Sequence, residues 1–83
     1  MKIYKYKLER FTNDVEVCKG SVFLHVGKDP KGQHCIWCAV PEDEYGTQVW
    51  TIVDVFTGHE IPYLGKYLGT VVDGELVHHY YLQ

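Results

Sequence analysis

Polar and apolar residues alternate along most of the chain with the period of a β-strand that has one face in solvent. Residues 3–8, IYKYKL, are the clearest case, because Tyr4, Tyr6 and Leu8 alternate with two lysines. Residues 21–27, SVFLHVG, repeat the pattern, and place Val22, Leu24 and Val26 on one face and Phe23 and His25 on the other. Four more segments rich in β-branched and aromatic residues predict strands: HCIWCAV (34–40), QVWTIVDVF (48–56), YLGTVV (67–72) and ELVHHYYL (75–82).

Turn-forming residues separate these segments. They are Thr12-Asn13-Asp14, Lys19-Gly20, residues 27–32, residues 41–46 and Asp73-Gly74. The Asp73-Gly74 pair is the sharpest hairpin signal in the chain. Residues 60–66 could form one short helical turn, which Pro62 and Gly65 would limit in length.

A chain of 83 residues is expected to form a single domain over residues 1–83, because it is too short to bury two cores. We predict an all-β fold: a small antiparallel meander of five to seven strands that curls into a half-barrel or a sandwich. The candidates to cover the apolar face are Trp37, Trp50, Phe23 and Phe56, or a second copy of the chain. Unpaired sheet edges also favour a closed homo-oligomer, most often a dimer.

Composition narrows the function. Hydrophobic residues make up 46% of the chain, which is typical of a folded domain. The net charge is −3, so we expect no overall electrostatic attraction to nucleic acid. No apolar run approaches the ~20 residues of a membrane span, and no signal-peptide pattern begins the chain. We therefore expect a cytoplasmic protein with no membrane or nucleic-acid partner, whose three cysteines are reduced.

Two groups of residues suggest chemistry without making a strong case for it. Cys35-Ile-Trp-Cys38 has the spacing of half a zinc site, but residues three apart on a strand point to opposite faces. His78 and His79 are adjacent on a strand, so they also face opposite sides. With no nucleophile set and no phosphate-binding loop, we expect no metal, no cofactor and no enzymatic activity.

The order of several motifs resembles a family of short, uncharacterised proteins from phages and bacteria. They are IYKY at the N-terminus, FLHV at 23–26, CIWCAV at 35–40, TGHEIP at 57–62, YLGTV at 67–71 and LVHHYYL at the end. The TGH turn followed by YLGT is the most specific part, and Phe56 stands where the family usually has a glycine. The resemblance implies a phage or prophage context, and no activity.

The stretch FTGHEIPYLGKYLGTV (56–71) is the candidate ligand site. Gly58 permits a sharp turn, Gly69 permits a close approach to its strand, and Thr57 and His59 offer polar groups beside Tyr63 and Tyr67. Few polar groups in an aromatic setting are typical of small-molecule sites. The predicted ligand-binding residues are Thr57, Gly58, His59, Tyr63, Tyr67 and His78. The alternative is that Thr57 and His59 only fix the loop by hydrogen bonds to its backbone.

Three hypotheses follow. The first is a non-enzymatic phage protein, located in the host cytoplasm, that sequesters a nucleotide-derived immune signal of its host. The second is a protein inhibitor or accessory factor acting through an exposed strand edge or aromatic patch. The third is a small hydrolase that uses His59 or His78.

Overall fold

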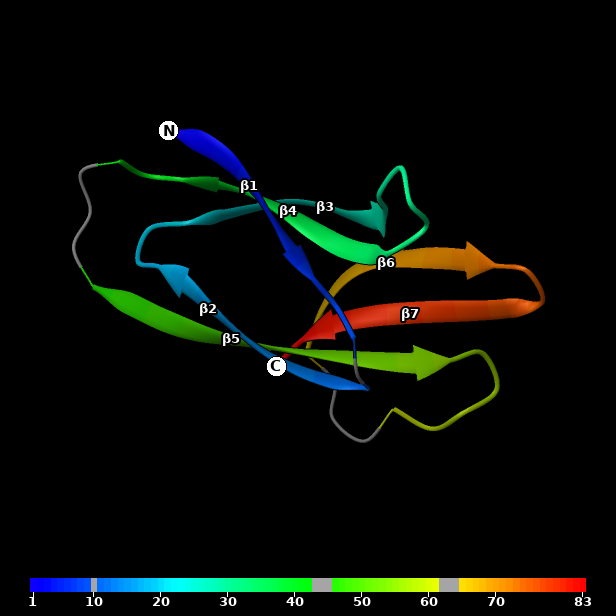
Figure 1. Cartoon of the computed structure of the whole chain (residues 1–83). Helices are drawn as coiled ribbons and strands as arrows, with labels where there is room; N and C mark the ends of the chain where they lie inside the picture. The colour runs from blue at the N-terminus through cyan, green and yellow to red at the C-terminus, as the bar shows by residue number, and fades with distance from the viewer. Residues whose placement is uncertain (10, 43–45, 62–64) are drawn as a thin grey trace.

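Seven antiparallel strands form two sheets that pack against each other as a small sandwich (Figure 1). The structure is a computed structural model that describes residues 1–9, 11–42, 46–61 and 65–83. The strands are β1 (Lys2–Lys7), β2 (Thr12–Cys18), β3 (Val22–Lys28), β4 (His34–Val40), β5 (Thr47–Phe56), β6 (Lys66–Asp73) and β7 (Leu76–Leu82). One sheet has the order β1-β4-β3 and the other β2-β5-β7-β6. The all-β class and the strand number are confirmed.

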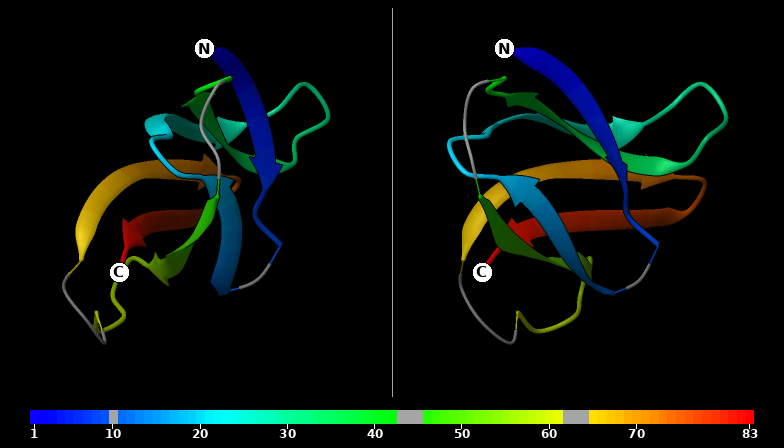
Figure 2. Two further views of the ribbon diagram at one scale, coloured as in Figure 1. Left: turned by 90° about the vertical axis from the view of Figure 1, so that its left-hand side faces the viewer. Right: turned by 60° about the vertical axis from the view of Figure 1, so that its left-hand side comes forward.

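The chain crosses between the sheets, so of the predicted architectures the sandwich describes it and a plain meander does not. Only β3–β4 and β6–β7 are hairpins of consecutive strands, whereas β1 pairs with β4, β2 with β5 and β5 with β7. The two views of Figure 2 show β1 leaving the upper sheet and β2 entering the lower one. The Asp73-Gly74 hairpin is confirmed, because β6 ends at Asp73 and β7 begins at Leu76.

Strand β2 was not predicted, and the turn expected at Thr12-Asn13-Asp14 is wrong. These residues begin β2, in which Asn13, Val15 and Val17 are buried in alternation with exposed residues. Asparagine is typical of turns, which is why the residue type at position 13 predicted one. Oδ1 of Asn13 instead accepts a hydrogen bond from the backbone N–H of Glu9 at 2.9 Å, which fixes the connection from β1.

A β-bulge in β3 overturns the predicted alternation of residues 22–26. The pairing with β4 skips Leu24, so Phe23 pairs with Cys38 and His25 with Trp37. The extra residue moves Phe23 to the same face as Val26 and leaves Val22 and Leu24 exposed. Phe23 consequently packs against the core.

The core between the sheets is largely aliphatic. It contains Leu8, Val15, Val17, Val26, Ile36, Cys38, Val40, Ile52, Val71 and Tyr80. Both tryptophans lie in strands, as predicted, but each is only half-buried: Trp50 packs at the margin of the core and Trp37 lies beside His25. Phe23 covers the core as expected, whereas Phe56 lines a cleft.

The two sheets approach most closely where β3 lies against β6. A Cβ atom on Gly69 would come within 2.6 Å of Cγ1 of Val26, so only glycine lets the strands pack at this distance. Gly69 also follows a register shift in the β6–β7 pairing. The predicted close approach at Gly69 is therefore confirmed, and a core residue of the opposite sheet makes it.

Within the described ranges the chain contains no helix, and hence none long and apolar enough to cross a membrane. The helical turn considered for residues 60–66 is not found at residues 60, 61, 65 or 66. Its remaining positions, 62–64, lie outside the described residues.

Candidate functional site

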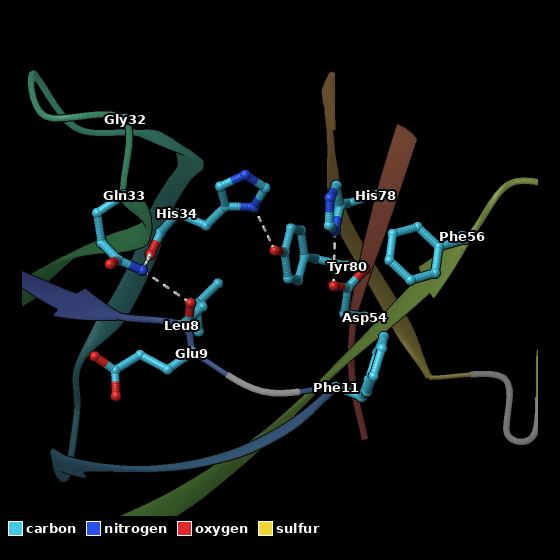
Figure 3. A pocket seen from close by; sticks show the side chains of 10 residues that line it. All are labelled: Leu8, Glu9, Phe11, Gly32, Gln33, His34, Asp54, Phe56, His78 and Tyr80. Carbon is cyan, nitrogen blue, oxygen red and sulfur yellow. Dashed lines mark hydrogen bonds and ion pairs between the residues drawn. The ribbon is translucent and has the colours of Figure 1, made fainter. Parts of the chain in front are cut away.

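A cleft of about 750 Å³ opens between the sheets at the end where β4 begins (Figure 3). One wall comes from the start of β4 with residues that follow β1 and precede β4, and the other from the end of β5, the middle of β7 and the residue before β2. The lining residues are Leu8, Glu9, Phe11, Gly32, Gln33, His34, Asp54, Phe56, His78 and Tyr80. The set combines aromatic rings with imidazole, carboxylate and amide groups.

His34 is held between the two sheets by hydrogen bonds at both ring nitrogens. Its Nδ1 lies 2.7 Å from the Tyr80 hydroxyl, and its Nε2 lies 3.0 Å from Oδ2 of Asp73. Asp73 also binds the ammonium group of Lys28 at 3.0 Å, and this cation together with His34 lowers the pKa of the carboxyl group. Burial raises the pKa of Tyr80, so its hydroxyl stays neutral.

His78 is held by a buried carboxylate on the neighbouring strand. Its Nδ1 lies 2.7 Å from Oδ2 of Asp54, whose side chain is only 7% exposed. The other oxygen of Asp54, Oδ1, is buried and has no hydrogen-bond partner among the described residues. Because a carboxylate accepts hydrogen bonds, the proton of this bond lies on Nδ1 of His78, and Nε2 carries the lone pair when the imidazole is neutral.

An aromatic wall runs along the second sheet from the mouth of the cleft to His78. The rings of Phe11 and Phe56 meet edge to face at 5.7 Å, and the ring of Phe56 lies 4.7 Å from that of His78. Phe11 is 65% exposed at the mouth. An exposed phenylalanine beside a concave surface is available for contact with a ligand.

A second cleft of about 510 Å³ adjoins the first and is lined by lysines. It shares Gly32 and Gln33 with the first cleft and adds Lys5, Lys7 and Lys31. Asp29 shapes its floor: the carboxylate accepts hydrogen bonds from Lys5 Nζ and from the backbone N–H groups of Gln33 and Lys31. These donors, with Lys5 foremost, lower the pKa of Asp29 to about 2.

The residues predicted as a single site divide between the two faces of the second sheet. The Thr57 hydroxyl lies 2.7 Å from Nε2 of His79, whose Nδ1 lies 2.9 Å from the hydroxyl of Thr70. Tyr67 hydrogen-bonds Thr70 on this face. His78 projects from the other face, into the cleft, as expected for two adjacent strand residues.

The remaining predicted residues lie in the turn after β5. Gly58 has a φ of +89°, which confirms the sharp turn expected there. The ring of His59 lies 5.8 Å from that of Phe56 but does not line the cleft; with Thr57 and Gly58 it lines a smaller hollow of about 210 Å³. Tyr63 lies outside the described residues.

All three cysteines are free thiols, and two of them are buried. Cys35 and Cys38 are both inaccessible to solvent, and burial raises the pKa of Cys38 to about 11. Because metals bind the thiolate form, this burial disfavours Cys38 as a ligand.

Sequence reasoning missed His34 and Asp54 as members of a site. Their signal was a polar residue within an apolar strand: Asp54 interrupts the run from Ile52 to Phe56, and His34 begins the apolar β4. Asp73 was interpreted only as a turn residue. Together His34, Asp73 and His78 offer three metal-ligating atoms that all lie within 4.8 Å of one another.

Comparison with known proteins gives one match. Residues 1–83 match the family described as a domain of unknown function (DUF7352). No curated protein and no solved structure matches the chain.

Proposed function

Given that the chain belongs to the DUF7352 family over residues 1–83, whose description assigns no activity, we propose from its site that it binds a nucleotide or a nucleotide-derived molecule without converting it. One observation carries the proposal: a cleft lined by aromatic and imidazole rings adjoins a cleft lined by lysines, and Gly32 and Gln33 belong to both.

The first cleft suits the planar part of such a ligand. Phe11 and Phe56 provide ring surface, and Gln33, whose Nε2 donates to the carbonyl oxygens of Leu8 and His34, offers its amide oxygen next to it. Aromatic side chains stack on any base, because every base has a π-face. A volume of about 750 Å³ is within the range of small-molecule sites.

The second cleft suits the anionic part. Lys7 and Lys31 are exposed, whereas Lys5 is paired with Asp29 at 2.9 Å. Ammonium groups bind phosphate as point charges, and this attraction weakens as the salt concentration rises. The net charge of −3 would disfavour long nucleic acid, while this local cation cluster still accommodates one or two phosphates.

The biological role we propose is sequestration. The resemblance to phage proteins favours a protein that acts in the cytoplasm of a bacterial host and holds a nucleotide-derived immune signal. A binding protein of this kind works by mass action and requires no catalytic group.

Binding of intact nucleotides tests this function directly. The protein is incubated with a panel of mononucleotides, cyclic nucleotides and ADP-ribose derivatives, and the bound molecules are recovered after heat denaturation. Intact release of one class supports the proposal, whereas cleavage products would indicate the hydrolase and no uptake would contradict binding.

Two variants locate the binding site. Phe11→Ala should weaken binding by about fivefold to more than a hundredfold, since stacking on one base is worth about 1–3 kcal/mol. Lys31→Ala should reduce both the affinity and its salt dependence. Lys66→Ala, an exposed lysine at the start of β6 that lines neither cleft, is the matched control.

A second candidate function uses the open edge of the first sheet. Strand β1 is an edge strand, and Met1, Ile3 and Tyr4 are exposed along it at 68%, 66% and 48%. Exposed apolar residues on a strand edge favour pairing with another chain, either a second copy or a target protein. Light scattering at tens of micromolar separates the two cases, because pairing with a second copy gives a dimer and pairing with a target protein leaves the purified chain a monomer.

A further inference from the structure

Three side chains from three strands converge beside the cleft: His34 and His78 line it, and Asp73 lies against His34. His34 begins β4, Asp73 ends β6 and His78 lies in β7, and one donor atom from each lies within 4.8 Å of the other two. The rings of His34 and His78 are 4.6 Å apart and meet edge to face. Two imidazoles this close repel each other when both are protonated. A cation bound by both rings would stabilise this close arrangement.

Each histidine has a partner that orients its ring. Asp54 accepts a hydrogen bond from Nδ1–H of His78 at 2.7 Å, so in the neutral imidazole Nε2 of His78 carries the lone pair that can bind an ion. His34 Nε2 becomes a ligand atom when an ion displaces the proton that it shares with Asp73, and Nδ1–H then donates a hydrogen bond to the Tyr80 hydroxyl, 2.7 Å away. Metal-binding histidines almost always have such a partner on the second nitrogen.

The third donor is already in contact with the first. Oδ2 of Asp73 lies 3.0 Å from Nε2 of His34. Donors around a tetrahedral zinc ion with bonds of about 2.0–2.1 Å lie roughly 3.3 Å apart. The three donor atoms lie within 4.8 Å of one another, so closing the site requires shifts of up to about 1.5 Å. Asp73 can provide part of this movement because its side chain is 48% exposed.

The local charge also favours a cation. Asp73 and the buried Asp54 place two carboxylates next to two imidazoles. Lys28 opposes a cation, but it binds Oδ1 of Asp73 and leaves Oδ2 facing His34. A divalent ion would offset the cost of holding Asp54 in a buried position where Oδ1 has no partner among the described residues.

We propose that His34, Asp73 and His78 bind one divalent transition-metal ion at the wall of the cleft. Two nitrogen donors and one carboxylate suit zinc and its first-row neighbours, and calcium and magnesium prefer oxygen donors. Three protein ligands leave at least one coordination position open, and the cleft is where a water molecule or an anionic ligand group would occupy it. This site goes beyond the proposed nucleotide binding and does not depend on it.

Titration with Zn²⁺ alone tests the site. The full chain is freed of metal with a chelator, which is then removed, and binding is measured by isothermal titration calorimetry without any nucleotide. We expect one ion per chain. Asp73→Asn and His78→Gln should each weaken binding at least tenfold, whereas His79→Gln, the neighbouring histidine on the opposite face of β7, should leave it unchanged.

Asp54→Asn separates a positioning role from a structural one. Loss of a partner that orients a ligand typically costs 10–100-fold in metal affinity. We expect a loss of this size in Asp54→Asn, with the stoichiometry of one ion retained. Thermal unfolding of the metal-free variants identifies any that fail to fold. Asp73→Asn, at an exposed turn, is the variant expected to keep its fold.

Cobalt distinguishes this site from the cysteines. Co²⁺ bound by imidazole and carboxylate gives visible ligand-field bands, and thiolate ligation adds strong charge-transfer absorption in the near ultraviolet. Thiolate absorption, unchanged Zn²⁺ affinity in the folded Asp73→Asn variant, or no binding by the wild-type chain would each overturn the proposal. Nucleotide uptake measured in the presence of a chelator remains a separate result, so the two proposals fail independently.

Discussion

Nδ1 of His78 lies 2.7 Å from Oδ2 of Asp54, and these two side chains join β7 to β5 at the inner face of the second sheet. The pair is largely buried, with the two side chains 13% and 7% exposed. The hydrogen bond sets the orientation of His78 in the cleft. Among the predicted ligand-binding residues that the structure describes, His78 is the one that lines this cleft.

This pair should show strong coupling. His78→Phe leaves a buried carboxylate without a partner and should cost about 3–5 kcal/mol, while His78→Phe combined with Asp54→Val removes both polar groups and should cost less than the sum. Chemical denaturation of the two single variants and the double variant gives the coupling energy. Additive losses would mean that the two side chains act independently.

The aliphatic core should dominate stability. Ile36→Ala empties a fully buried position between the sheets and should destabilise the protein by about 2–5 kcal/mol. Ile3→Ala, at a position 66% exposed on β1, should change stability by no more than about 0.5 kcal/mol. Urea denaturation measures both. A comparable loss in Ile3→Ala would indicate that β1 is covered in solution, as a dimer would require.

The close approach of β3 and β6 predicts a rescue. Gly69→Ala places a Cβ against Val26 and should cost about 1–3 kcal/mol as an overpacked site. Val26→Ala removes the clashing methyl group, so the double variant should be destabilised by less than the sum of the single variants. If the loss in the double variant equalled the sum of the two single losses, the backbone conformation at Gly69, with a φ of +158°, would be the cause instead.

Asp29 should make stability depend on pH under acidic conditions. Its pKa is about 2 in the folded chain, below the ordinary value of 3.8, so the charged carboxylate stabilises the fold. The contribution is complete above the ordinary value and is lost as the pH falls through about 2. Asp29→Asn should lower the free energy of unfolding at neutral pH and reduce its fall between pH 3.8 and about 2. Glu16→Gln, on the exposed face of β2, should do neither.

The turn after β5 provides a test of the site expected from sequence. Thr57→Ala removes the hydrogen bond to His79 on the outer face, and should cost about 1 kcal/mol while leaving nucleotide binding unchanged. Gly58→Ala strains a residue with positive φ and should lower stability by more than the roughly 0.4–1 kcal/mol that a compatible alanine would add. His59→Ala, next to Phe56, should weaken binding without lowering the melting temperature.

If instead Thr57→Ala abolished binding at unchanged stability, the ligand would lie on the outer face, and the cleft between the sheets would lose its role. Measuring affinity and melting temperature on the same preparations separates these outcomes.

Alternation in two segments, together with β-branched and aromatic residues in four more, was sufficient to predict an all-β domain and six of the seven strands in the described residues. A strand exposes one face and buries the other, so a period of two is visible without knowledge of any partner. The Asp73-Gly74 hairpin and the turn at Gly58 follow from local backbone preferences in the same way. These features depend only on residues that are close together in the chain, so they can be predicted from the sequence.

Tertiary structure decided everything that depends on partners far apart in the chain. Pairing of β1 with β4 and of β2 with β5 brings His34 of one sheet against His78 of the other, 44 positions later in the numbering. The bulge at Leu24 turns Phe23 inward, and no local pattern fixes where an extra residue enters a strand. Asp54 and Asp73 acquire their roles only from the imidazoles that fold against them, because a carboxylate has the same sequence signature in a turn, in an ion pair and beside a metal.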